Sequence, residues 1–245
     1  MFTNTEERVK TLALALSDNQ VSVAWNAARD LARIGPEATA ALPLLSDALR
    51  SRDATTALWA RYAIAKITGD VRKHLPLIID SLKDKKRIWP GMASAAVAGF
   101  GPDARDAVPL LIADLTDEHS DNRWGAAGAL ANIGPAAHEA VPALTEALKD
   151  WDEKVRWYAA WALGEIGEGA LPAVPALITC LEDYDEDVRG YAIRSLAKIV
   201  ESGSEAAEPV ISALMQRRDD ELETETIRSE AESAMLALTG DSASV

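Results

Sequence analysis

The chain has 245 residues, a formal net charge of −14 and an apolar content of 48%, in which aromatic residues are scarce at 5%. Such an acidic chain is poorly suited to phosphate backbones, which are bound by clustered Lys and Arg. Cys180 is the single cysteine, so an internal disulfide framework is excluded, and no apolar stretch reaches the length of a membrane span. These features, and a charged start unlike a signal peptide, predict a cytoplasmic protein without nucleic-acid or membrane partners.

A unit of 33 residues recurs along the chain in six near-copies. Several columns of equivalent residues mark this interval, among them the alanines Ala27, Ala60, Ala93, Ala126, Ala159 and Ala192, and the prolines Pro43, Pro76, Pro109, Pro142 and Pro175. A repeat of this length cannot bury its apolar side alone and stacks on its neighbours, which favours an elongated protein that offers a surface to a partner.

Each repeat is predicted to be a hairpin of two helices, A and B. The predicted A helices lie near residues 4–17, 36–50, 71–83, 103–116, 136–149, 169–182 and 204–217, and a B helix follows each of them. We therefore predict an all-α fold of about seven helical hairpins that stack into a superhelix. One repeat domain is expected over residues 1–240, with repeats at about 1–35, 36–68, 69–101, 102–134, 135–167, 168–202 and 203–240 and a short tail at 241–245.

The prolines predict an interruption in helix A. Helix A often opens with Gly-Pro, as at 35–36, and a second proline such as Pro43 follows seven residues after the first. Because that proline removes a backbone hydrogen bond, we expect a kink or a short separate first turn. In the B helix of the fifth repeat, Val155, Ala159 and Leu163 share one apolar face, and Gly167 is expected to end the helix.

Two segments of the fifth and sixth repeats resemble a known family. Residues 155–167 (VRWYAAWALGEIG) and residues 173–178 (AVPALI) resemble the HEAT-like repeats that were first grouped with phycobilisome lyases. The resemblance covers nearly the whole chain and implies that the all-α fold is a right-handed αα superhelix (HEAT-like solenoid) of about seven helical hairpins. It implies that the A helices lie on the convex side of the superhelix and that the B helices line its concave side.

The face of the B helices opposite to the apolar face carries the candidate binding residues. Five of the seven tryptophans fall on this face, together with tyrosines and basic residues. The candidates are Trp25, Arg29, Arg33, Trp59, Tyr62, Lys66, Trp124, Trp157, Tyr158, Trp161, Tyr191, Arg194 and Lys198. Two interpretations stay open: neighbouring B helices pack their large side chains on each other, or an exposed aromatic row forms a groove for a ligand. The basic residues suit carboxylates or phosphates of a partner, or are solvated charges at helix ends.

No catalytic, metal or cofactor site emerges from the sequence. His74, His119 and His138 are the only histidines and none pairs with another at helical spacing, so a metal site is not expected. Arg123, Arg156 and Arg189 recur at the repeat interval and are expected to bridge neighbouring repeats through acidic residues of the turns.

The sequence therefore favours a protein that is not an enzyme and is a monomer in isolation. We expect it to bind a protein or peptide through the aromatic, mildly basic face of the B helices, and this partner can carry anionic groups. The alternative is a subunit of a tetrapyrrole (bilin) lyase or a chaperone-like subunit that holds such a chromophore. Aromatic walls and arginines for propionate groups suit that function too.

Overall fold

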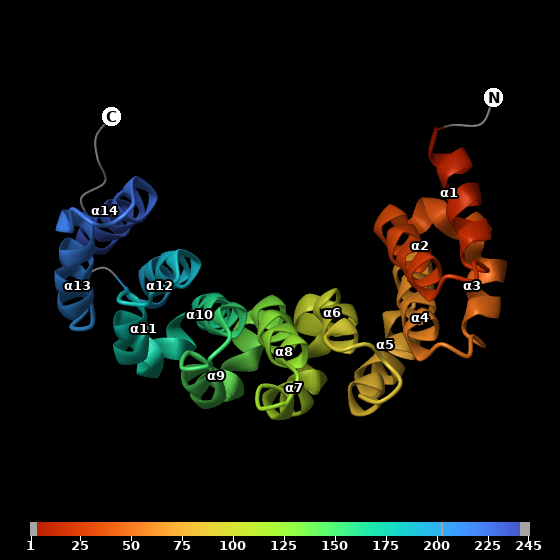
Figure 1. Ribbon diagram of the computed structural model, residues 1–245, viewed down its shortest axis with the longest axis horizontal. Helices are drawn as coiled ribbons and strands as arrows, with labels where there is room; N and C mark the ends of the chain where they lie inside the picture. Colours follow the sequence, from red (N-terminus) through yellow and green to blue (C-terminus); the bar gives the residue numbers. More distant parts are fainter. Residues whose placement is uncertain (1–3, 202, 241–245) are drawn as a thin grey trace. The chain divides into compact units, whose positions relative to one another are not determined.

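The computed structural model describes residues 4–201 and 203–240, and every regular element in these ranges is a helix (Figure 1). The helices form two compact units that divide between Val97 and Ala98. The predicted all-α class of stacked helical hairpins is confirmed within each unit. One repeat domain over residues 1–240 stays a prediction across the division, and the predicted tail at 241–245 lies outside the described residues.

Unit 1 contains three A helices and the B helices that pack on them. Its elements are α1 (Asn4–Ala15), α2 (Val21–Ile34), the 3-10 helix η1 (Gly35–Ala41), α3 (Leu42–Ala48), α4 (Ala54–Thr68), α5 (Val71–Asp80), the 3-10 helix η2 (Ser81–Lys83) and most of α6 (Met92–Ala98).

Unit 2 contains the most regular repeats. Its elements are η3 (Gly101–Ala107), α7 (Val108–Asp114), α8 (Ser120–Ile133), η4 (Gly134–Ala140), α9 (Val141–Ala147), α10 (Glu153–Ile166), η5 (Gly167–Ala173), α11 (Val174–Cys180), α12 (Glu186–Ile199), α13 (Ala207–Asp219) and α14 (Glu225–Thr239). The B helices α8, α10 and α12 lie side by side on one side of this unit, and α7, α9 and α11 lie on the other (Figure 1).

The prolines divide most A helices, as predicted. In the second repeat, η1 is followed directly by α3, which starts at Leu42 and has Pro43 at its second position. Within η1, the backbone of Ala38 is not helical, with a ψ of 17°. Proline suits this place because the first N–H groups of a helix have no partner within it. The third repeat differs, because α5 continues through Pro76 without such a division.

The B helices approach one another closely through small residues. Ala126, Ala159 and Ala192 are fully buried, and Gly164 of α10 faces Ser195 of α12. A Cβ atom at residue 164 would lie 3.0 Å from the Ser195 Cα atom, and the Ser195 hydroxyl donates a hydrogen bond to the Ala160 carbonyl at 2.7 Å.

Gly167 ends α10, as predicted. It has a φ of +74°, and its N–H bonds to the Leu163 carbonyl. Left-handed φ values of this kind favour glycine because it has no Cβ atom. Among the helices of the described residues, none combines the length and the apolar character needed to cross a bilayer.

Candidate functional site

The thirteen predicted binding residues separate into two groups, one in each unit. Helices α2 and α4 carry the six residues of unit 1, and α8, α10 and α12 carry the seven residues of unit 2. Each group is described by itself.

The aromatic residues of unit 1 form a buried cluster rather than an open surface. Trp25 is 8% exposed and Trp59 is 5% exposed, and their rings stack with centroids 6.4 Å apart. Tyr62 meets the Trp59 ring edge-on at 5.3 Å and is half-buried, and burial raises the pKa of its hydroxyl. The prediction that Trp25 and Trp59 are open to a partner is therefore wrong, because neighbouring B helices cover these rings.

The indole nitrogens of this buried cluster lack hydrogen bonds. The Nε1 atoms of Trp25 and Trp59 are buried, and neither has a hydrogen-bond partner. The guanidinium of Arg29 lies over the Trp25 ring at 5.3 Å from its centroid, a cation–π contact. Trp25 and Trp59 thus contribute apolar burial and ring stacking to unit 1.

The aromatic residues of unit 2 form a ladder across three helices. Trp124 of α8 stacks on Tyr158 of α10 with ring centroids 5.4 Å apart, and Trp157 stacks on both Tyr158 at 3.7 Å and Tyr191 of α12 at 4.9 Å. Trp161 tilts against Tyr158 at 5.9 Å. All five rings are half-buried, so the ladder keeps part of its surface in contact with solvent.

A glycine provides the place for the central ring of this ladder. A Cβ atom added at Gly128 of α8 would lie 3.1 Å from Cε1 of Tyr158, so the Tyr158 ring rests on the backbone of the neighbouring helix. The sequence gives a signal for this contact, because Gly128 lies one helical turn after Trp124 on the same face of α8.

The basic residues of the predicted face already have partners in the chain. Lys198 pairs with Glu165 at 2.6 Å, Arg194 pairs with Glu230, and in unit 1 Arg33 bonds to Asp30 at 3.2 Å. These acidic partners thus neutralise much of the positive charge that was predicted for this face. Arg194 also lies over the Tyr191 ring at 4.3 Å, and Lys66 at the end of α4 is exposed.

Glu165 was missed as an organising residue of the ladder. One of its oxygens accepts hydrogen bonds from Trp161 Nε1 at 2.9 Å and from the Lys198 ammonium. The Lys198 hydrogen bond is the main cause that lowers the pKa of Glu165, and the Trp161 hydrogen bond adds to it. The signal was present in the sequence, because Glu165 follows Trp161 by four residues and precedes Lys198 by one repeat.

The three recurring arginines form a row of buried ion pairs, as predicted. Arg123 bonds to Asp150 at 2.7 and 2.8 Å, Arg156 bonds to Asp183 at the same two distances, and Arg189 bonds to Glu223 at 2.7 Å. We call each of these pairs a clasp. In each clasp the arginine also donates to two successive carbonyls of the turn before its own helix, which are those of residues 117 and 118, 150 and 151, and 183 and 184.

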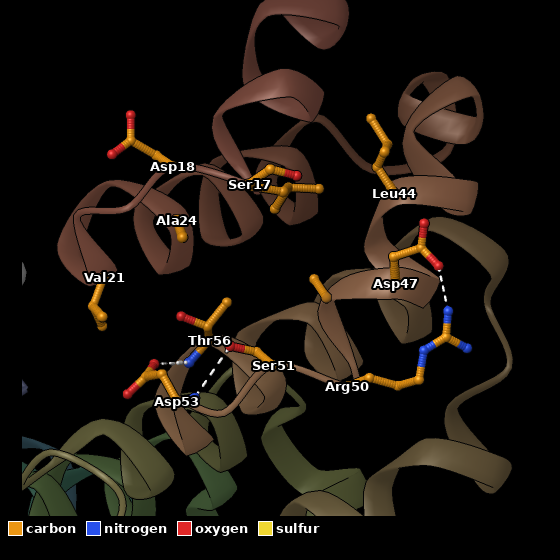
Figure 2. A pocket seen from close by; sticks show the side chains of 12 residues that line it. Ser17, Asp18, Val21, Ala24, Leu44, Asp47, Arg50, Ser51, Asp53 and Thr56 are labelled. Atoms are coloured by element: carbon orange, nitrogen blue, oxygen red, sulfur yellow. Dashed lines mark hydrogen bonds and ion pairs between the residues drawn. The ribbon is translucent and has the colours of Figure 1, made fainter.

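Two cavities lie beside the turns that connect the A helices to the B helices. One, of about 300 Å³, lies in unit 1 between the ends of α1 and α3 and the starts of α2 and α4 (Figure 2). The other, of about 430 Å³, lies in unit 2 beside Arg123, Asp150 and Trp151. Trp151 is 74% exposed and stacks over the Arg123 guanidinium at 5.1 Å.

No group of three or more metal-ligating side chains comes together within residues 4–201 and 203–240. Cys180 is buried in α11, and burial raises the pKa of its thiol to about 11. This environment disfavours the reactive thiolate.

A family model of HEAT repeats matches residues 76–153 and 141–235 of this chain. No curated protein matches the sequence. Among solved structures, the archaeal HEAT-like repeats protein from Thermococcus onnurineus NA1 has a TM-score of 0.61 at 16% identity, over 95% of this chain and 97% of that one.

Two further solved structures are similar in fold. A designed armadillo repeat protein in complex with the peptide (KR)4 has a TM-score of 0.56 at 19% identity, over 94% of this chain and 99% of that one. The complex of CpcE and CpcF of phycocyanin lyase from Nostoc sp. PCC7120 has a TM-score of 0.52 at 22% identity, over 66% of this chain and 98% of that one. At these identities the likeness concerns the fold.

Proposed function

Since this chain belongs to the family of HEAT repeats, we propose that it is a non-enzymatic scaffold that binds a protein or peptide through the aromatic ladder of unit 2. The observation that carries this proposal is the ladder itself. Its five rings, Trp124, Trp157, Tyr158, Trp161 and Tyr191, continue across three B helices and remain half-buried.

Half-buried aromatic rings are the side chains that most often carry binding energy at interfaces. The stacking of Trp157 between Tyr158 and Tyr191 orders these rings before a partner arrives. A surface that is ordered in advance loses less side-chain entropy on binding, which favours affinity. A partner with an apolar or aromatic anchor would cover the remaining exposed ring surface.

Charged residues beside the ladder would contribute to the binding of a partner that carries carboxylate or phosphate groups. The pairs Arg194–Glu230 and Lys198–Glu165 are partly exposed, so each contributes little stability on its own. A carboxylate or phosphate of the partner can therefore compete with Glu230 or Glu165 at modest cost. In unit 1, Arg29, Arg33, Tyr62 and Lys66 remain proposed contacts, whereas Trp25 and Trp59 are assigned to the core. Two findings support the proposal of peptide binding. They are the membership of the chain in the HEAT repeat family and its similarity in fold to the designed armadillo repeat protein in complex with the peptide (KR)4.

The double variant Trp157→Ala/Trp161→Ala tests the proposal. Peptides are selected from a displayed random library on the wild-type protein, and their affinities are measured by tryptophan fluorescence and by calorimetry. We expect the double variant to lose at least tenfold in affinity while its helical circular dichroism persists. The matched control Trp157→Phe/Trp161→Phe keeps flat rings and should bind within a few-fold of wild type. Equal affinity of the alanine variant and the wild type would refute the ladder as the binding surface.

The alternative function is that of a tetrapyrrole (bilin) lyase subunit or a chaperone-like subunit for such a chromophore. The similarity to the CpcE and CpcF complex of phycocyanin lyase is the observation that favours it. Titration of the protein with a bilin separates the two functions. A saturable absorption change that the alanine double variant loses would support the alternative, and an unchanged bilin spectrum would remove it.

A further inference from the structure

The three most exposed large apolar side chains of residues 4–201 and 203–240 lie at one edge of unit 2. Trp151, Tyr184 and Leu222 are 74%, 78% and 95% exposed. They come from three successive turns, which precede the B helices α10, α12 and α14. Single exposed apolar side chains are common, whereas a group of them on one surface marks an interaction site. We call these three residues the turn row.

The clasps hold the three turns side by side. The Arg156 guanidinium donates to the Trp151 carbonyl at 3.4 Å, and it also lies against the Tyr184 ring, at 4.7 Å from the ring centroid. Arg189 repeats this arrangement in the next turn. It donates to the Tyr184 carbonyl at 3.2 Å and to Glu223 of the third turn at 2.7 Å. The turn row is therefore continuous.

Each of the two rings in the turn row covers an arginine with one face. Trp151 lies over Arg123 at 5.1 Å, and Tyr184 lies over Arg156 at 4.7 Å. This contact uses one face of a ring, and the large exposed fractions show that the other face of each ring is in contact with solvent. The equivalent positions of four other turns carry the polar residues Asn19, Arg52, Lys85 and Glu118. The turn itself therefore does not require an aromatic residue.

The turns that carry the turn row are strongly acidic. They contain three, five and four acidic residues, and no lysine or arginine, over residues 150–153, 182–187 and 220–225. The clasp arginines and Arg217 use five of these carboxylates. The exposed Glu153, Asp187 and Glu221 are among the seven that have no ion-pair partner in the part of the chain that the structure describes.

This charge decides which kind of partner fits the turn row. A second copy that docks with the same edge would bring acidic turns against each other, and an anionic lipid surface or a nucleic acid would be repelled as well. A basic segment of a protein is attracted by the free carboxylates and by the ring faces, which carry partial negative charge. Arginine fits better than lysine, because its planar group stacks on aromatic rings. The inner faces of Trp151 and Tyr184 already hold a guanidinium in this way.

We propose that the turn row binds a basic segment of a partner protein, whose arginine side chains stack on the outer faces of Trp151 and Tyr184. The stem of a further arginine packs against Leu222, and its charged end pairs with Glu221. The cavity of about 430 Å³ beside Trp151 gives room for another side chain of the segment. This surface is distinct from the aromatic ladder, so the proposal goes beyond the proposed function.

The spacing of the repeats sets the spacing of the contacts. Neighbouring packed helices lie roughly 10 Å apart. A polyproline II segment rises about 3.1 Å per residue and returns to the same side every third residue, so it advances by about 9 Å between side chains that point the same way. The segment is therefore expected to carry an arginine at every third position.

The experiment titrates the full-length, 15N-labelled protein with the acetylated and amidated peptide (Arg-Gly-Ser)3 at low ionic strength. We expect saturable shifts of the amide signals of residues 150–153 and 182–187, and weaker binding when salt is added. The peptide (Lys-Gly-Ser)3 keeps the charge without the planar group and should bind roughly threefold more weakly or less tightly still. The peptide (Glu-Gly-Ser)3 reverses the charge and should cause no shifts.

Two double variants test the rings. Trp151→Ala/Tyr184→Ala should lose roughly tenfold or more in affinity for (Arg-Gly-Ser)3 while its helical circular dichroism persists, because both rings are exposed. The matched control Trp151→Phe/Tyr184→Phe keeps two flat rings and should bind within a few-fold of wild type.

Two further double variants test the charge. Glu153→Gln/Asp187→Asn removes two free carboxylates of the turns, so it should weaken binding and reduce its salt dependence. The matched control Glu201→Gln/Glu208→Gln removes two exposed acids that lie away from these turns and should leave binding unchanged.

Three results would overturn the proposal. They are the absence of saturable shifts with (Arg-Gly-Ser)3, equal affinity for (Lys-Gly-Ser)3, and equal affinity of Trp151→Ala/Tyr184→Ala and wild type. The Trp157→Ala/Trp161→Ala variant should bind (Arg-Gly-Ser)3 like wild type, so failure of this surface and failure of the aromatic ladder are distinguishable.

Discussion

Arg156 and Asp183 meet in a parallel, two-bond ion pair, with Nε to Oδ2 at 2.7 Å and Nη2 to Oδ1 at 2.8 Å. The two side chains are only 6% and 12% exposed, and the Arg156 guanidinium also bonds to the Asp150 carbonyl at 2.9 Å. In each of the three clasps, one arginine thus links the turn before its own helix to the turn of the following repeat.

Arg156→Ala should lower the free energy of unfolding by about 3 kcal/mol or more, because it leaves the Asp183 carboxylate buried and unpaired. Urea unfolding followed by circular dichroism measures the loss. The control Arg218→Ala removes an exposed arginine that pairs with its neighbour Asp219, and it should change stability little. A small effect of Arg156→Ala would mean that the clasp does not stabilise the repeats.

Gly164→Ala should destabilise unit 2 by roughly 1–3 kcal/mol, because the new methyl group would meet the backbone of Ser195 and force α10 and α12 apart. Gly128→Ala is the matched comparison and should cost less, since its methyl group would meet a side-chain ring, that of Tyr158, rather than the backbone of the next helix. Thermal unfolding of the two variants gives the comparison. If Gly164→Ala were as stable as wild type, the close approach of the two helices would not need glycine.

Trp59→Phe should be much less costly than Trp59→Ala. Phenylalanine keeps most of the stack on Trp25 and removes an indole N–H that has no hydrogen-bond partner, whereas alanine leaves a cavity that costs about 3–5 kcal/mol. Chemical denaturation of both variants measures the difference. Equal losses would indicate that the Trp59 N–H makes a hydrogen bond in solution.

Cys180 should make the stability of the protein depend on pH in the alkaline range. Burial raises the pKa of its thiol to about 11, whereas an exposed thiol titrates near about 8.5. Between these values the unfolded chain loses a proton that the folded chain keeps, so stability falls as pH rises, by up to about 1.4 kcal/mol per pH unit.

The variant Cys180→Ala should lack this contribution. Urea unfolding of wild type and variant from about pH 8 to about pH 10, in the presence of a reductant, compares the two slopes. Parallel slopes would show that the Cys180 thiol ionises equally in the folded and the unfolded protein.

The repeat interval made several structural features predictable. Arg123, Arg156 and Arg189 recur at the repeat interval, and the structure joins each of them to an acidic residue of the following turn, 27 residues later in the first two clasps and 34 residues later in the third. The second proline of the repeat correctly predicted a divided A helix at Pro43. These features depend on contacts within one repeat or between adjacent repeats, which periodicity encodes directly.

The exposure of the predicted site residues could not be read from the sequence. A helical projection places Trp25, Trp59 and Trp157 on equivalent faces, yet the first two are buried and the third is half-buried. The projection treats a helix in isolation, whereas exposure depends on which side chains of the adjacent helices cover that face. The partners of Arg194 and Lys198 lie on different helices for the same reason.

The sequence by itself determined the helical hairpins, their order and the buried columns, because each follows from apolar spacing repeated every 33 residues. Only the tertiary structure decided which aromatic rings stack into a half-buried ladder and which charges are already paired. These properties arise where side chains from several helices meet in space, and the shape and charge of such a place depend on all of them together.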